Sequence, residues 1–348
     1  MSYHSYLTVL VPAIVALAVT LIGTKFLMGF MYNAGITTTE KNKGKREYPL
    51  PSGIGPAVAF GFAVGILTYV FGSSFNFYTA EANLTYLFAA LISVFLIAFV
   101  GFLDDIVIQK EVVLPKGVRN TGRGLKQWQK PILTLIGAIP LMAVNAGVST
   151  ISIPFLGLVD FGIFYPIVLI PLAVVFSSNA FNLLGGFDGL TAGTGLIACI
   201  GFLAYSLAFG TYTGAVISAM LVSTLLAFLI FTLYPTKLIP GDSFTYFVGA
   251  GFVIAMVLGN MEAFGVIVIF PFFIEFLLHL KGRFRTSDLG KRRSDGTFEN
   301  PYGRRVYSWT HFFMNLKRCR EWEVSLYMWI AEALFVLLGF GLYGLHLL

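Results

Sequence analysis

Two adjacent carboxylates, Asp104 and Asp105, close an apolar stretch of the chain in the segment Gly-Phe-Leu-Asp-Asp. An acidic side chain at the centre of a membrane costs about 2.5–3.5 kcal/mol on insertion, and less near the interface. Such a pair suits a hard divalent cation, or one acid can act as a base while the other stays ionised. The alternative explanation is a solvated helix end.

A second polar cluster begins with Asn179 and Asn182, which are three residues apart and therefore share one face of a helix. Gly185 and Gly186 are expected to end that helix, which leaves Asp188 in a glycine-rich turn where backbone can approach a ligand. Amide and carboxylate oxygens are good ligands for Mg²⁺. The alternative role for such Asn side chains is hydrogen bonding between membrane helices.

A third candidate, Asp242, stands in the segment Pro-Gly-Asp-Ser at the start of another apolar run, where a helix N-cap is the alternative explanation. Basic residues complete the set, among them Lys43, Lys130, Arg292 and Arg293. Acids that hold a metal among Lys and Arg side chains are typical of a site for phosphate groups. Contact with lipid headgroups is the alternative for each basic residue.

Composition defines the elements that must position these side chains. Of the 348 residues, 57% are hydrophobic and 11% are charged, which indicates a polytopic membrane protein made of helices. A segment of about 20 apolar residues crosses the hydrocarbon layer, which is about 30 Å thick. Ten such segments lie near residues 6–30, 53–73, 85–103, 130–148, 162–183, 192–210, 212–234, 244–260, 262–281 and 325–347.

All 23 Lys and Arg residues fall on one predicted side of the membrane. By the positive-inside rule that side is cytoplasmic, so both termini lie outside, and the outer segment 149–160 is predicted to form a short hairpin. The predicted fold is a single all-α polytopic membrane domain over residues 1–348, in the plasma membrane if the organism is prokaryotic. Its cytoplasmic loops, which carry the candidate site, are expected near 31–52, 104–129, 184–191, 235–243 and 282–324.

The net charge of +6 is explained by this topology and by anionic headgroups, so nucleic acid is not an expected partner. Glu275, His279 and Glu332 lie inside predicted spans, which is typical of transporters and proton relays. The spacing of Glu275 and His279 allows them to pair, whereas Glu332 has no evident partner. A transporter of an anionic metabolite is therefore the alternative class, although it needs polar groups along a path across the bilayer.

In order and spacing, five segments resemble motifs of the polyprenyl-phosphate N-acetylhexosamine-1-phosphate transferases, over nearly the whole chain. They are Gly35-Ile36 with Glu40 and Lys43, Gly101–Asp105, Lys130, Asn179–Leu190 and Gly241-Asp242. Glu40 stands where the family usually has Asp. The resemblance implies a fold of ten spans with a cytoplasmic active site. It also implies Mg²⁺, with Mn²⁺ as the alternative ion, and displacement of UMP from a UDP-N-acetylhexosamine by a lipid phosphate.

The same resemblance assigns roles to particular residues. It implies that Asn182 and Asp242 bind the metal and that Asp104, Asp105 and Lys130 are catalytic. The residues expected to bind substrate are Lys43, Asn179, Asp188, Arg292, Arg293 and His311. Family members are often dimers, which leaves a homodimer open.

Departures from the family pattern bear on the sugar. The branch that transfers phospho-MurNAc-pentapeptide has an acid at the position of Gly185 and a His-rich motif in the last loop, where this chain has Arg292, Arg293 and Ser-Trp-Thr-His. This favours transfer of GlcNAc-1-phosphate to a polyprenyl phosphate of the dolichyl type, the first membrane step of lipid-linked glycan assembly. Transfer from another UDP-N-acetylhexosamine is the alternative reaction. The sequence leaves open the length of the polyprenol and whether the reaction passes through a covalent aspartyl intermediate. A CDP-alcohol phosphatidyltransferase is a further enzymatic alternative, since Asp188-Gly189 is similar to the start of that family's motif. The motif requires an Ala-Arg pair soon afterwards, and residues 190–205 contain none.

Overall fold

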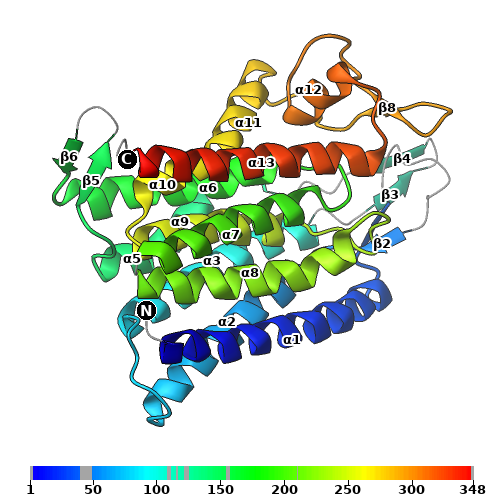
Figure 1. Cartoon of the computed structure of the whole chain (residues 1–348). Coiled ribbons are helices and arrows are strands. Elements are labelled where there is room, and N and C mark those ends of the chain that lie inside the picture. Colours follow the sequence, from blue (N-terminus) through cyan, green and yellow to red (C-terminus); the bar gives the residue numbers. More distant parts are fainter. Residues whose placement is uncertain are drawn as a thin grey trace.

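A computed structural model of the chain describes residues 3–39, 49–107, 111–114, 117–120, 125–153, 157–209 and 211–345. Its long helices run side by side and form a bundle, from which α11 and α12 project (Figure 1). The helices are α1 (Tyr3–Asn33), α2 (Gly55–Ser74), α3 (Leu84–Val107), α4 (Gln129–Thr134), α5 (Ile139–Ala143), α6 (Ile170–Leu183), α7 (Leu190–Phe209), α8 (Tyr212–Thr232), α9 (Asp242–Leu258), α10 (Glu262–Val268), α11 (Phe270–Lys281), α12 (Trp309–Leu316) and α13 (Glu321–Gly344). A short turn of 3-10 helix (η1, Leu135–Ala138) joins α4 to α5. A short turn of π-helix (η2, Tyr165–Leu169) precedes α6.

Seven helices of the described residues are long and apolar enough to cross a membrane, namely α1, α2, α3, α6 with η2, α7, α8 and α13. The pair α10 and α11 is also apolar but bends by 51° between them, where Pro271 opens α11 and cannot continue a helix. Two shorter apolar helices cover Gln129–Ala143 and Asp242–Leu258. The all-α membrane fold is thus confirmed and each predicted segment contains a helix, while ten crossings stay a prediction.

Within the described residues, four antiparallel strand pairs lie outside the helices. They are β1 (Thr37–Thr39) with β2 (Pro49–Pro51), β3 (Glu111–Leu114) with β4 (Gly117–Asn120), β5 (Thr150–Ile153) with β6 (Gly157–Asp160), and β7 (Lys291–Arg292) with β8 (Phe298–Glu299). The pair β5–β6 confirms the hairpin predicted near residues 149–160. At its base the Ser149 hydroxyl donates a 2.6 Å hydrogen bond to Asp160.

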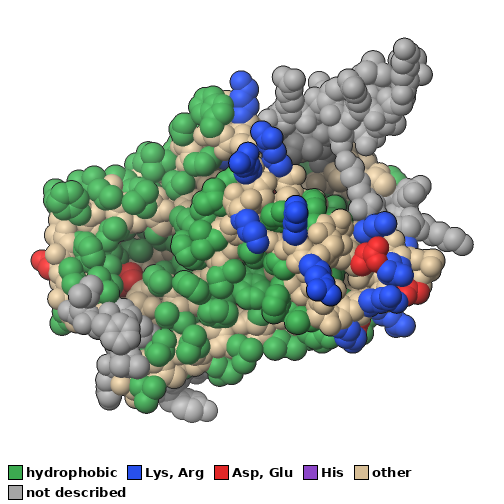
Figure 2. Space-filling view, turned by 90° about the horizontal axis from the view of Figure 1, so that it is seen from above, with side chains coloured by type: hydrophobic (Ala, Val, Ile, Leu, Met, Phe, Trp, Pro, Cys, Tyr) green, Lys and Arg blue, Asp and Glu red, His purple; other side chains and the backbone are tan. Residues whose placement is uncertain are grey.

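The two ends of the bundle differ in what they carry. Both chain termini and the hairpin β5–β6 lie at one end, whereas β2, β3, β4 and β8 lie at the other (Figure 1). Figure 2 shows the Lys and Arg side chains of one face gathered toward the second end, while hydrophobic side chains cover the first. This separation agrees with the predicted grouping of the basic loops. The side of the membrane that each end faces stays a prediction.

Helix α9 forms the centre of the bundle. Every residue from Ser243 to Leu258 is buried, as expected for a helix that is apolar on all sides. Helix α3 approaches α9 closely at Gly101, where an added Cβ would lie 2.5 Å from the backbone nitrogen and Cα of Ser243. Small residues permit such close helix contacts. The contact brings the acidic end of α3 to the first turn of α9.

Substitution of Gly101 tests this contact. We expect Gly101→Ala to destabilise the protein by about 1–3 kcal/mol because the added methyl group must push two helices apart. The matched control is Gly29→Ala in α1, where an added Cβ meets nothing within 4 Å. Thermal unfolding in detergent is the measurement, and equal midpoints for the two variants would contradict the predicted contact.

Candidate active site

The site begins where the end of α3 meets the start of α9. The Asp105 carboxylate accepts hydrogen bonds from the backbone N–H groups of Asp242 at 2.6 Å and Ser243 at 3.0 Å. It also accepts one from the Ser243 hydroxyl at 2.6 Å. The first N–H groups of a helix have no partner within it, so Asp105 caps α9 from a neighbouring helix. This contact fixes the position of Asp242.

The cap leaves no room for a side chain beside it. Gly241 has a φ of +82°, and a Cβ at this position would lie 2.5 Å from Asp105 Oδ2. Only glycine adopts this conformation readily and also permits the contact. The backbone therefore requires glycine at position 241, independently of any chemical role of Asp242.

A lysine joins two of the acids. The Lys130 ammonium lies 2.6 Å from Asp104 Oδ2 and 2.7 Å from Asp242 Oδ2. Asp104 is fully buried, and its Oδ1 accepts a 2.5 Å hydrogen bond from the backbone N–H of Leu125. The side chains of Lys130 and Asp242 keep 15% and 21% of their surface exposed, so the cluster is reachable from outside. Lys130 opens α4 and thereby ties it to α3 and α9.

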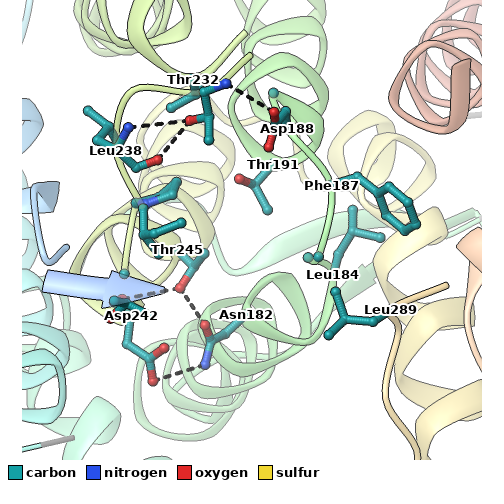
Figure 3. A pocket seen from close by; sticks show the side chains of 18 of the residues that line it. Asn182, Leu184, Phe187, Asp188, Thr191, Thr232, Leu238, Asp242, Thr245 and Leu289 are labelled. Carbon is teal, nitrogen blue, oxygen red and sulfur yellow. Dashed lines mark hydrogen bonds between the residues drawn. The ribbon is translucent and has the colours of Figure 1, made fainter. Parts of the chain in front are cut away.

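Asn182 of α6 completes the cluster. Its amide nitrogen donates to Asp242 Oδ2 at 3.3 Å, and its oxygen accepts a 2.5 Å hydrogen bond from the Thr245 hydroxyl (Figure 3). Asn179, three residues earlier, points to a different neighbour. Its amide donates to Thr134 of α4 at 3.0 Å and to the Val175 carbonyl at 2.8 Å. The two Asn residues thus bridge α6 to α9 and to α4 respectively.

Asn182 and Asp242 form one side of a cavity of about 410 Å³. Its other walls come from the α6–α7 loop, the α8–α9 loop, β1 and the last long loop (Figure 3). Hydroxyl, amide and apolar groups share the lining, which consists of Thr38, Thr39, Asn182, Leu184, Gly185, Gly186, Phe187, Asp188, Gly189, Thr191, Thr232, Thr236, Leu238, Ile239, Pro240, Gly241, Asp242, Thr245 and Leu289. The size and the mixed lining suit a small polar molecule with an aromatic or sugar ring.

Asp188 holds two cavity walls together. Its Oδ2 accepts a 3.0 Å hydrogen bond from the backbone N–H of Thr236, in the α8–α9 loop. Its own N–H donates to Glu321 at 3.2 Å, and its carbonyl accepts from Ser325 at 2.8 Å. Because both partners belong to α13, this last helix fixes the loop that follows α6.

Asp288 is a cavity neighbour that sequence reasoning missed. A Cβ on Gly185 or Gly186 would lie 3.2 or 3.1 Å from Asp288 Oδ2, so the last loop packs directly on the two glycines. Burial and the nearby Glu275 raise the pKa of Asp288 to about 6. The segment Ser-Asp-Leu-Gly around Asp288 has no motif, and the only signal was the paired glycines opposite it.

Several predicted substrate-binding residues lie away from the cavity lining. Arg292 and Arg293 are exposed, and Arg293, directly after β7, forms an ion pair with Glu299 of β8. His311 is buried, and its ring centroid lies 5.2 Å from that of Tyr302. Burial lowers the pKa of His311 to about 4. Asn179 is also absent from the lining, and Lys43 and Glu40 lie outside the described residues. Substrate binding by these residues stays a prediction.

Three ionisable residues were predicted inside the spans, and the structure shows the partners of two of them. Glu275 and His279 pair at 3.0 Å, as their spacing allowed, and Glu275 also accepts the backbone N–H of Trp309 at 2.8 Å. Glu332 is fully buried, and its carboxylate oxygens have no hydrogen-bond partner among the described residues. Cys199 and Cys319 are both free thiols.

The donor set at the cavity is compatible with Mg²⁺. No three His, Cys, Asp or Glu side chains in the described ranges converge as a ready-made metal site. The cavity instead offers the Asp242 carboxylate and the Asn182 amide as oxygen ligands. Enzymes commonly hold Mg²⁺ by one or two carboxylates together with water and substrate phosphates, so this sparse set fits an ion that the substrate also binds.

Comparison with known proteins identifies the family. Residues 87–260 match the profile of glycosyl transferase family 4. A protein of Sulfolobus acidocaldarius is 33% identical over 96% of both chains, and one of Saccharolobus solfataricus is 32% identical over 96% of both. Both are provisionally named UDP-N-acetylglucosamine–dolichyl-phosphate N-acetylglucosaminephosphotransferase. The phospho-N-acetylmuramoyl-pentapeptide-transferase of Halalkalibacterium halodurans is 33% identical over 69% of both. The chain therefore belongs to glycosyl transferase family 4 and is a membrane phosphotransferase, which confirms the resemblance found in its motifs.

Variants of Asp105 separate its capping role from a chemical one. We expect Asp105→Ala to lower the thermal midpoint clearly, since each buried N–H left without an acceptor costs about 1–3 kcal/mol. Ser243→Ala removes one hydroxyl donor and leaves both N–H contacts, so its midpoint should fall much less. If Asp105→Ala unfolded at the wild-type temperature but lost activity, the cap would be unimportant and a chemical role would stand.

The raised pKa of Asp288 predicts a pH effect on stability. The folded protein favours the protonated form, so the stabilisation is complete below the ordinary pKa of 3.8 and is lost as pH rises through about 6. Asp288→Asn should therefore raise the thermal midpoint at pH 7.5, by about 2 °C or more, and change it little near pH 4. Asp295→Asn, at an exposed position of the same loop, is the control that should give no gain. A gain of equal size at both pH values would refute the linkage.

Proposed function

We propose that the protein transfers GlcNAc-1-phosphate from UDP-GlcNAc to a polyprenyl phosphate of the dolichyl type and releases UMP. The observation that carries the proposal is the cluster of Lys130, Asp242 and Asn182 at the edge of the cavity. Lys130 supplies one positive charge, and Asp242 and Asn182 offer oxygen ligands for a metal ion. Transfer of a phosphoryl group requires such positive charge around the phosphates. The names of two relatives that match nearly the full chain support this reaction.

The reaction needs positioning and charge neutralisation more than a strong base. An oxygen of the lipid phosphate forms a bond to the phosphorus attached to the sugar, and the bond from that phosphorus to the UMP oxygen breaks with its electron pair. The lipid phosphate is already anionic, so it needs no strong base. Asp104 and Asp105 are both engaged in short contacts within the protein, which favours direct attack over an aspartyl intermediate.

Charge at the diphosphate is neutralised from two sides. Lys130 places a cation beside the cavity, and Asp104 holds that ammonium in place from its buried side. Asp242 and Asn182 would hold Mg²⁺, which supplies further charge stabilisation for the leaving UMP. We place the nucleotide along the loop from Leu184 to Gly189, where backbone N–H groups of the loop and the hydroxyls of Thr191 and Thr245, which also line the cavity, can donate to it.

The membrane arrangement follows from the same proposal. The basic end of the bundle faces the cytoplasm, where UDP-sugars are found, both termini face outside, and the ten apolar segments cross the bilayer. The long lipid tail can then remain in the hydrocarbon layer while its phosphate reaches Lys130 in the first turn of α4. A transporter would instead need polar groups along a path across the bilayer.

Phospho-MurNAc-pentapeptide transfer is the second candidate, because bacterial enzymes of that name match 62–69% of the chain. The two candidates share the chemistry and differ in the group that the last loop must accommodate. The contact of Gly185 with Asp288 leaves little room for an acidic side chain at position 185, the feature that marks the muramyl branch.

Release of UMP by the purified protein tests the proposed reaction. With polyprenyl phosphate and Mg²⁺, we expect release from UDP-GlcNAc and none from UDP-MurNAc-pentapeptide. Asp242→Ala should lower the rate on the order of 100-fold or more, because it removes a charged group at the reacting phosphates. Asp295→Ala, at an exposed acid far along the last loop, should leave it unchanged.

The outcomes are distinct. Release only from the muramyl substrate would keep the reaction type and overturn the proposed sugar. No release from either substrate, by protein shown to be folded through its thermal transition, would contradict the proposed function itself.

A further inference from the structure

We propose that the Lys130 ammonium competes with the divalent cation for Asp242, so that metal binding releases Lys130 from Asp242 toward the substrate phosphate. The proposal deepens the proposed function, since it rests on a metal at Asp242, but it concerns binding and not turnover. Lys130 then keeps Asp104 as a partner and exchanges Asp242 for the substrate phosphate.

The first argument is the occupancy of one oxygen atom. Asp242 Oδ2 receives the Lys130 ammonium at 2.7 Å and the Asn182 amide nitrogen at 3.3 Å. Both neighbours are hydrogen donors, and a carboxylate oxygen has only two lone pairs. A cation that binds this oxygen must therefore replace one of them. Asn182 must also turn its amide to offer oxygen, an exchange that the Thr245 hydroxyl can accommodate by donating or accepting.

The second argument is that Lys130 can leave Asp242 without losing every partner. Its ammonium also lies 2.6 Å from Asp104, which is fully buried and anchored by the Leu125 N–H. Lysine is a compact charge on a flexible stem, so a small movement breaks one ion pair and keeps the other. Asp242 has the more exposed side chain of the two acids, so it is the one that a cation from solution reaches first.

The third argument is the charge of the cluster. Asp104, Asp105, Asp242 and Lys130 together carry a formal charge of −2, which repels a diphosphate. Addition of a divalent ion brings this total to zero and so removes the repulsion. Because the ion also frees a lysine, metal binding creates two cationic contacts for phosphate in a single step. The site then binds substrate strongly only after the metal is present.

Metal binding to the full-length protein in detergent, without sugar nucleotide or lipid phosphate, tests the competition. The probe is Mn²⁺, followed by electron paramagnetic resonance, with Mg²⁺ as competitor. We expect Lys130→Met to bind Mn²⁺ about tenfold more tightly than the wild type, because the competing charge is gone. The matched control is Lys126→Met, an exposed lysine one turn earlier, which should bind as the wild type does.

Thermal unfolding supplies the second measurement. In EDTA, Lys130→Met should unfold at a lower temperature than the wild type, because two acids then lack their counter-ion. Mg²⁺ should restore most of this loss and stabilise the variant more than it stabilises the wild type. Lys130→Arg keeps the charge and should bind Mn²⁺ no more tightly than the wild type, which provides a folded comparison if the Met variant is unstable.

Unchanged or weaker Mn²⁺ binding by Lys130→Met, or tighter binding by Lys130→Arg, would overturn the competition. The same holds if neither the wild type nor Lys130→Met binds Mn²⁺. None of these results depends on UMP release, so a failure of the competition can be told apart from a failure of the proposed reaction.

Discussion

The hydrogen bonds from the first turn of α9 to Asp105 are the contact on which the site depends. A buried helix needs acceptors for its first N–H groups, and in this bundle the acceptor comes from α3. Because the contact spans two helices, it sets their register as well as their distance. Asp242, Lys130 and Asn182 can then meet at one point, since each belongs to an element that packs on α3 or α9.

The arrangement of charge follows from the same constraint. Acids are costly in an apolar bundle, and Asp104, Asp105 and Asp242 lie near its end and are paired with donors, whereas Glu332 is the buried exception. Asp104 and Asp105 differ in how they are satisfied, although they are adjacent in the chain. One faces a lysine and the other a helix terminus, so a single Asp-Asp motif performs an electrostatic task and an architectural one.

Much of this organisation could be predicted from residue types and their order. The apolar segments, the hairpin at residues 149–160 and the pairing of Glu275 with His279 are local features, and local spacing determines them. The motifs were also enough to identify the family. The cap at Asp105 could not be predicted, because it depends on which helices become neighbours. Asp288 was missed for the same reason, since it meets Gly185 only after the last loop folds back.

The contact between Asp288 and the two glycines has a consequence for how such a chain can change over time. A side chain added at position 185 would press on a carboxylate that another segment has already placed there. A smaller residue at position 288 alone would open a gap beneath the loop. The two positions can therefore change freely only together, and proteins of this family should show them as a covarying pair.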